Sequence, residues 1–240
     1  MLRQNTNHSE CGYVLSITPY RETDGMVQFL GETSGLIRLV LPAYYKPKSK
    51  QGNLGLEFTY VRYRFNSQEN RLNRIIGGDI LNNYKELRSN MSWLLDMSLI
   101  REVLVRTYSG ENEKWVYDAF HKFMQESDSR YQLVLFLVNT IERHGFNPDV
   151  SGCVVCGSPL INEFSVRQGG FLCNRHSHRQ DSKYLLMMMK GLFSKSDVSK
   201  YAAEGKIDAV VERLLQYIEF YFDIRLKTWE LIKEIGEYEV

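Results

Sequence analysis

The chain has 240 residues and a formal net charge of +1, with 30 Lys/Arg against 29 Asp/Glu. This length exceeds the usual size of a single domain, so we expect two domains, and 43% hydrophobic and 12% aromatic residues can fill their cores. The balanced charge excludes a protein that is basic over its whole surface, but it permits local basic patches. No stretch approaches the roughly 18 apolar residues of a membrane span, and the first ten residues lack the apolar segment of a secretion signal. We therefore expect a soluble, intracellular protein with no membrane partner.

The charges are distributed unevenly along the chain. Residues 1–78 contain ten Lys/Arg and six Asp/Glu, and residues 153–200 contain seven and three. Residues 79–152 contain eight and eleven, and residues 201–240 contain five and nine. Two basic blocks thus alternate with two acidic blocks, and a polyanionic partner is expected to bind the basic ones.

The first basic block predicts a small β-barrel. Short β-rich runs are separated by segments rich in Gly, Asp and Ser, which are typical of turns. The predicted strands are residues 12–20, 26–30, 36–41, 56–65 and 72–77. Five short strands within about 70 residues are typical of a closed or nearly closed barrel, of which the OB-fold is the commonest kind. We predict an OB-fold domain over residues 1–80.

A basic loop joins the third and fourth predicted strands. OB-type barrels bind single-stranded nucleic acid through a cationic groove and through aromatic rings on which bases stack. The loop offers both kinds of side chain, in Tyr44, Tyr45, Lys46, Lys48 and Lys50. Further cations of this block that extend the predicted nucleic-acid-binding surface are Arg21, Arg38, Arg62 and Arg64. The alternative is that the lysines only make the loop soluble.

From residue 79 the spacing of apolar residues becomes helical. Ser129 is a predicted N-cap and Gly145 a predicted left-handed stop for one of these helices. The predicted helices are residues 91–108, 115–124, 131–144, 184–193 and 207–222. We predict an α+β protein in which the OB barrel is followed by a helical domain over residues 81–240, with an inserted zinc knuckle at about residues 150–180.

The insert is predicted from the spacing of its cysteines. Two residues separate the members of each predicted ligand pair, so a tight turn can present both to one tetrahedral Zn²⁺. The predicted ligands are Cys153, Cys156, Cys173 and His176. His178 is an alternative fourth ligand, and ordinary buried thiols are the alternative to a metal site. Four protein ligands close the coordination shell, which favours a structural rather than a catalytic zinc ion.

A second basic surface is predicted to follow the knuckle. Its cations are Arg175, Arg179, Lys183, Lys190, Lys195 and Lys200. Two cationic surfaces on one molecule can hold two strands together, because they offset the repulsion between phosphates.

In this order, several motifs resemble the RecO family of bacterial recombination mediators. The N-terminal motifs are Gly12-Tyr13-Val14-Leu15, Tyr20-Arg21-Glu22-Thr23-Asp24 and Gly35-Leu36-Ile37. The later ones are Gly145-Phe146-Asn147-Pro148-Asp149, Cys153-Val154-Val155-Cys156-Gly157, Gly169-Gly170-Phe171-Leu172-Cys173 and, more loosely, Arg225-Leu226-Lys227-Thr228. Two features differ from the family pattern: His176 stands where zinc-bearing members usually have a fourth cysteine, and residues 42–50 lack the glycines of the usual basic loop.

The resemblance implies a DNA-repair protein of the RecF recombination pathway. Such a protein binds single- and double-stranded DNA, anneals complementary strands, and works with RecR to load RecA onto DNA coated by single-strand binding protein. It implies a location in the bacterial cytoplasm, at the nucleoid. The acidic tail of single-strand binding protein ends in a hydrophobic residue, and the Met-rich segment 185–190 is a candidate receptor for it. Core packing is the other interpretation of this segment.

Two other classes of function remain as alternatives. One is a zinc-ribbon adaptor or transcription factor, and the other is a zinc-dependent nuclease. The sequence contains neither a Walker A loop nor a nucleophile elbow. His121 and His144 lie in predicted helices without an evident catalytic partner, and we interpret them as partnered structural side chains. We therefore predict that the protein is not an enzyme.

Overall fold

The computed structural model describes residues 6–49, 51–67, 72–110, 114–125, 129–201 and 206–236. Contacts between residues divide the chain into two compact units. The first contains residues 1–97 and 108–121, and the second contains residues 98–107 and 122–240. Within the described ranges, every helix is too short or too polar to traverse a lipid bilayer.

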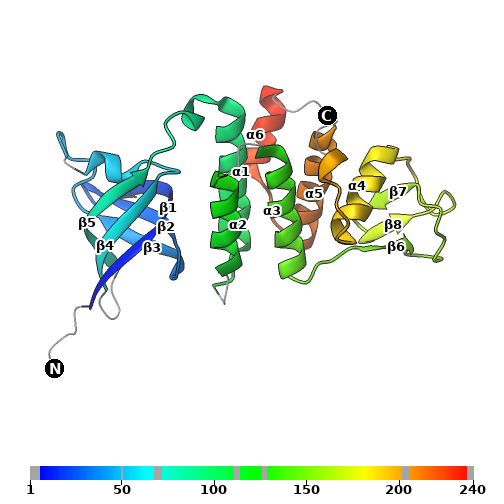
Figure 1. Cartoon of the computed structure of the whole chain (residues 1–240), viewed down its shortest axis with the longest axis horizontal. Helices are drawn as coiled ribbons and strands as arrows, with labels where there is room; N and C mark the ends of the chain where they lie inside the picture. Colours follow the sequence, from blue (N-terminus) through cyan, green and yellow to red (C-terminus); the bar gives the residue numbers. More distant parts are fainter. Residues whose placement is uncertain are drawn as a thin grey trace. The chain divides into compact units, whose positions relative to one another are not determined.

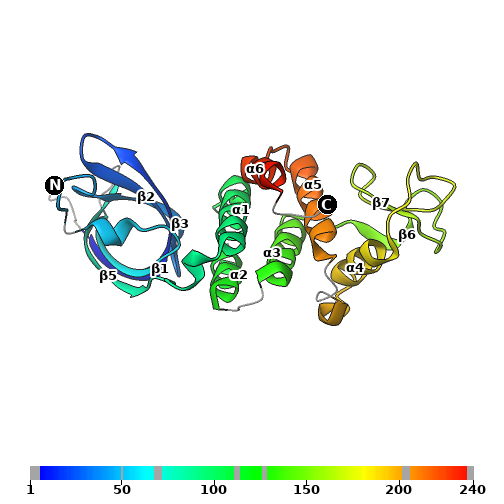
Figure 2. The ribbon, with the colours of Figure 1, turned by 90° about the horizontal axis from the view of Figure 1, so that it is seen from above.

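The first unit contains a closed five-stranded barrel with the strand order β1-β2-β3-β5-β4 (Figures 1 and 2). Strand β5 runs parallel to β3, and the other neighbours are antiparallel. The strands are β1 Thr6–Tyr20, β2 Asp24–Gly31, β3 Gly35–Leu41, β4 Tyr60–Ser67 and β5 Asn73–Asn82. Five strands in one closed, OB-like barrel confirm the predicted fold of this unit.

Alternation along the strands separates the barrel core from its outer surface. In β4, Val61, Tyr63 and Phe65 are buried in the core, whereas Arg62 and Arg64 are exposed. The remaining core residues come from the other four strands: Val14, Val27, Phe29, Leu39, Leu41 and Ile75. This pattern presents the arginines of β4 to solvent, where a ligand can reach them.

Two strand boundaries differ from the prediction. The predicted strand 56–65 was wrong at its start, because the 3₁₀ helix η1 Gly52–Gly55 and the positive φ of Phe58, 56°, interrupt extended backbone before Tyr60. Strand β1 begins at Thr6, six residues before its predicted start. Its polar first half pairs with β4 and its apolar second half with β2, so only the second half carries a hydrophobic signal.

The structure confirms the five predicted helices and adds a sixth. Gly145, with φ of 78°, ends α3, and the N–H of Phe146 donates to the carbonyl of Ile141 at 3.1 Å. Helix α3 packs on α5 (Figure 1). The helices are α1 Met91–Thr107, α2 Lys114–Gln125, α3 Ser129–Arg143, α4 Lys183–Phe193, α5 Ile207–Tyr221 and α6 Lys227–Ile235. Helix α6 escaped prediction because it is short and buries only Trp229 and Ile232.

A small three-stranded sheet with the order β6-β8-β7 lies between α3 and α4 in the sequence. Its strands are β6 Asp149–Cys153, β7 Glu163–Ser165 and β8 Gly170–Leu172. The antiparallel pair β7–β8 confirms the predicted hairpin, and β6 adds a parallel neighbour to β8. The sheet brings the end of β6 close to the end of β8, and both predicted ligand pairs begin at these ends.

Candidate metal centre and nucleic-acid surface

The four predicted ligands converge in the structure. Cys156 Sγ lies 3.7 Å from Cys173 Sγ, and His176 Nδ1 lies 3.5 Å from Cys153 Sγ and 3.3 Å from Cys173 Sγ. All four ligand atoms lie within 4.8 Å of one another. His178 is not part of this cluster, its side chain is exposed, and its backbone N–H donates to Glu163. The structure therefore places His176, rather than His178, with the thiols.

These separations fit a tetrahedral zinc ion. Zn–S bonds of about 2.3 Å and Zn–N bonds of about 2.0–2.1 Å at tetrahedral angles separate two sulfurs by about 3.8 Å, and a sulfur from a nitrogen by about 3.6 Å. The observed sulfur–sulfur distance of 3.7 Å and sulfur–nitrogen distances of 3.3 and 3.5 Å are close to these values. Three thiols and one imidazole are also the donors that zinc prefers.

Two tight turns present the ligands. In the first, the N–H of Gly157 donates to the carbonyl of Cys153 at 2.7 Å, and Gly157 has a φ of 70° that glycine adopts without strain. In the second, the N–H groups of His176 and Ser177 both donate to the carbonyl of Cys173 at 2.9 Å. The turns explain why a gap of two residues suits each ligand pair.

The backbone around the thiols favours their metal-binding form. Burial raises the pKa of Cys153, but N–H groups of Cys173, Val155 and Cys156 and the side chain of His176 outweigh it and lower that pKa to about 6. The Ser158 N–H lowers the pKa of Cys156, whereas burial and the neighbouring thiols raise it, and the net change is upward. A cation among the sulfurs relieves this conflict, because it stabilises several thiolates together.

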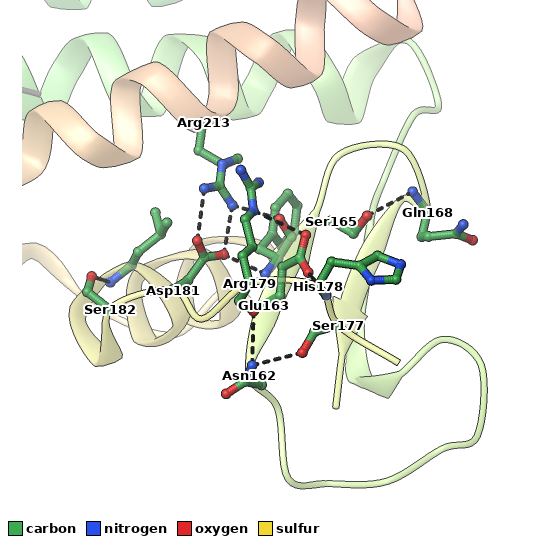
Figure 3. A network of polar contacts seen from close by, with 12 residues as sticks. Asn162, Glu163, Ser165, Gln168, Ser177, His178, Arg179, Asp181, Ser182 and Arg213 are labelled. Atoms are coloured by element: carbon green, nitrogen blue, oxygen red, sulfur yellow. Dashed lines mark hydrogen bonds and ion pairs between the residues drawn. The ribbon is translucent and has the colours of Figure 1, made fainter. Parts of the chain in front are cut away.

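A buried ion pair connects the knuckle to α5 (Figure 3). Arg213 donates two hydrogen bonds to the carboxylate of Asp181, at 2.8 and 3.0 Å, and a third to the carbonyl of Phe164 at 2.7 Å. The side chains of Arg213 and Asp181 are only 10% and 7% exposed. Phe164 completes the arrangement, since its N–H donates to Asp181 at 2.8 Å.

A second set of contacts fixes the segment that follows the histidine ligand (Figure 3). Glu163 forms an ion pair with Arg179 at 3.2 Å and accepts the N–H of His178. The amide of Asn162 donates to the Ser177 hydroxyl at 2.8 Å and to the Arg179 carbonyl at 3.0 Å. Sequence reasoning missed both sets of contacts, although a single arginine within the apolar face of α5 is a signal of a buried partner.

The predicted basic loop is present on the barrel unit. Lys46 and Lys48 are exposed, and the ring of Tyr45 is 43% exposed. Tyr44 is half-buried, packs on the barrel core and meets Tyr45 edge-on with ring centroids 4.8 Å apart. Tyr45 therefore offers a more accessible ring than Tyr44. Lys50 lies outside the described residues.

The predicted arginines of the barrel are all exposed, but their surroundings differ. The guanidinium of Arg21 lies 5.2 Å from the centroid of the Tyr20 ring. Arg38 is exposed on β3, and Arg62 pairs with Cys11 across β4 and β1. Arg64 forms an ion pair with Asp79 at 3.1 Å, which reduces the charge that it offers to a ligand.

The cations after the knuckle also differ from one another. Arg175 is exposed and has no ion pair within the part of the chain that the structure describes, whereas Arg179 is paired with Glu163. The lysines of this surface, all exposed, are Lys183, Lys190, Lys195 and Lys200. In the Met-rich segment, Leu185, Leu186, Met188 and Met189 are buried, which confirms core packing as its role.

The two interpreted histidines have structural partners. His121 Nδ1 lies 2.6 Å from the Tyr13 hydroxyl, and His144 Nε2 lies 2.8 Å from the Thr107 carbonyl. These contacts confirm that both are partnered side chains.

An OB-type barrel followed by helices, with a closed Cys₃His metal knuckle inserted between them, defines a modular non-membrane-spanning class of binding protein in its described part. Residues 6–84 match the family model described as Recombination protein O N terminal, and residues 114–230 match Recombination protein O C terminal. The chain belongs to the RecO family.

Curated relatives span the same length. The chain is 21% identical to the DNA repair protein RecO of Bacillus mycoides, in an alignment that covers 95% of this chain and 98% of the relative. It is 24% identical to the DNA repair protein RecO of Thermodesulfovibrio yellowstonii, again over 95% of this chain and 98% of the relative.

Proposed function

We propose that this chain is a non-catalytic DNA-repair mediator, with an OB domain over residues 1–80 and a helical domain over residues 81–240. It binds single- and double-stranded DNA, anneals complementary strands and, with RecR, loads RecA onto DNA coated by single-strand binding protein, at the nucleoid in the bacterial cytoplasm. The observation that carries the proposal is the match of both halves of the chain, in order, to a family whose relatives are named DNA repair proteins.

The barrel supplies a surface suited to single strands. We call the exposed residues Arg38, Tyr45, Lys46 and Lys48 the barrel surface. Its cations can bind phosphates, and the exposed ring of Tyr45 can stack on a base, a contact that contributes about 1–3 kcal/mol in such proteins. Arg21, Arg62 and Tyr44 flank this role, while Arg64 is held partly by Asp79.

The helical unit supplies a second cationic surface, formed by Arg175, Lys183, Lys190, Lys195 and Lys200. Annealing requires that two polyanions approach each other, and cations bound to each strand replace its condensed counterions and reduce the repulsion. Two cationic surfaces on one chain support annealing without ATP hydrolysis.

A structural zinc ion is part of the proposal. Cys153, Cys156, Cys173 and His176 would hold it, and the ion would crosslink the ends of β6 and β8. Because four protein ligands fill a tetrahedral shell, this ion has no open position for a substrate.

Charge reversal of Lys46 and Lys48 should weaken DNA binding and annealing together. Each lost phosphate contact on a single strand lowers the slope of log affinity against log salt by about 0.7, so the Lys46→Glu/Lys48→Glu variant should lose about 1.4. The measurements are fluorescence anisotropy with oligonucleotides at several salt concentrations, and the annealing rate of two complementary strands.

The matched control reverses two exposed lysines in other parts of the chain, Lys85→Glu/Lys206→Glu. It changes the net charge equally and should leave the slope near that of the wild type. Equal losses in both variants, or no loss in either, would contradict the assigned surface. Binding that depends on base sequence rather than on oligonucleotide length would contradict the mediator role itself.

A further inference from the structure

Two aliphatic side chains project from the metal knuckle. Leu160 is 79% exposed and Val155 is 58% exposed. A single exposed aliphatic residue is ordinary on a protein surface. These two lie within six residues of each other in one small insert, beside exposed Pro159.

The knuckle holds these side chains on a fixed backbone. Val155 lies between two ligand cysteines, and the Cys153 N–H donates to the carbonyl of Ser158 at 2.9 Å. The N–H of Leu160 donates to the Ser158 hydroxyl at 3.3 Å, and the N–H of Asn162 donates to the carbonyl of Leu172 at 2.8 Å. A rigid apolar projection loses little conformational entropy when it binds.

A cation lies in the facing ligand turn. Arg175 occupies the gap between the ligands Cys173 and His176, as Val155 occupies the gap between Cys153 and Cys156. Because the four ligand atoms lie within 4.8 Å of one another, the two turns are neighbours. We call Val155, Pro159, Leu160 and Arg175 the knuckle tip.

The charge of the insert leaves the tip positive. Residues 152–182 contain two carboxylates, and both are engaged inward: Glu163 with Arg179, and Asp181 with the buried Arg213. Neither acidic group is available to oppose the charge of Arg175. The tip therefore complements a partner that combines negative charge with apolar faces.

We propose that the knuckle tip is a contact site for unpaired bases of single-stranded DNA, with Leu160 and Val155 against the bases and Arg175 on an adjacent phosphate. This inference rests on the proposed DNA-binding function and assigns a role to a surface outside the barrel. Side chains exposed to this extent project as wedges, and apolar wedges are a means by which proteins contact or separate stacked bases. The hydrophobic end of an acidic peptide needs instead a pocket that encloses it.

The test uses full-length, zinc-loaded protein and two oligonucleotides of equal length, one with bases and one abasic. The Val155→Ser/Leu160→Ser variant should bind the base-bearing strand about 5- to 10-fold more weakly, in line with stacking contacts worth about 1–3 kcal/mol per base. Its affinity for the abasic strand and its salt slope should not change. Arg175→Gln should lower the slope by about 0.7 on both strands.

The control variant Met91→Ser/Leu231→Ser alters exposed aliphatic residues elsewhere, and it should bind both strands as the wild type does. Zinc content of one ion per chain verifies that each variant retains the knuckle. If the tip variant binds both strands normally while the wild type binds and anneals DNA, the tip assignment is wrong and the proposed function stands. If the tip variant loses affinity only for an acidic peptide with an apolar end, the tip is a protein-docking site and the inference is overturned. If the wild type binds no oligonucleotide, both proposals fail.

Discussion

Replacing Asp181 with alanine should destabilise the helical unit by about 3–5 kcal/mol, because it leaves Arg213 as a buried charge without its counterion. Arg213 is 10% exposed and directs two hydrogen bonds to Asp181 and one to the Phe164 carbonyl. The hydrogen bond from the Phe164 N–H is lost as well. Hydrogen exchange of α4 and α5, followed by mass spectrometry in increasing urea, measures the change in the affected unit.

A double variant separates a lost pair from a buried charge that lacks a partner. Asp181→Leu/Arg213→Met replaces both members by apolar side chains, and such replacements of buried pairs are often neutral or stabilising. It should recover most of the stability that Asp181→Ala loses. The exposed pair Arg225–Glu230 provides the control, since Arg225→Gln should leave the unfolding midpoint unchanged. If Asp181→Ala and Arg225→Gln behave alike, the buried pair does not anchor the knuckle.

The same pair predicts a loss of stability in acid. Burial alone would raise the pKa of Asp181, but hydrogen bonds from Arg213 and the Phe164 N–H, with the charge of Arg213, lower it below its ordinary value. A carboxyl group whose folded pKa is lowered contributes stability that is present above its unfolded pKa, about 3.9, and that is lost as pH falls through the folded pKa. The Asp181→Asn variant should therefore depend less on pH below about pH 4, as urea unfolding of the helical unit at several pH values can measure.

The barrel was predictable because its strands carry local signals. Alternation in β4 and the turn residues between strands suffice to count five strands, and five short strands suggest an OB-fold. The start of β4 was not predictable in this way, because Phe58 is as apolar as a strand residue and its positive φ is imposed by tertiary structure. The polar first half of β1 is a strand because it pairs with β4, which the sequence of β1 does not reveal.

The candidate site divides along the same line. Spacing alone predicted the four ligands, because a tight turn relates each pair locally and the chemistry of zinc relates the pairs. The Asp181–Arg213 pair joins residues 32 positions apart, and Asp181 lies in a polar loop where a carboxylate is ordinary. The partial burial of Tyr44 beside exposed Tyr45 likewise depends on the packing of the loop on the barrel core.

Loss of the metal should unfold the knuckle while the barrel persists. The insert has strands of three to five residues and few buried side chains, so a crosslink between its two ligand turns supplies much of its order. We expect the purified protein to contain one zinc ion per chain, and cobalt substitution to give the absorption spectrum of a tetrahedral site. After chelation, hydrogen exchange in residues 149–182 should accelerate at least 100-fold, while exchange in β1–β5 should not change.

Single substitutions should identify the ligands without reference to DNA binding. Cys173→Ser should abolish stoichiometric zinc, because Cys173 is buried and its sulfur lies 3.7 Å from Cys156 Sγ and 3.3 Å from His176 Nδ1. Cys11→Ser should retain one ion, because this fourth cysteine lies outside the cluster. His178→Ala should also retain it, whereas His176→Ala should not, and His176→Cys should restore a closed four-thiolate shell. Zinc retained by His176→Ala but lost by His178→Ala would mean that the second turn rearranges on metal binding, so that the tip geometry around Arg175 would have to be reassigned.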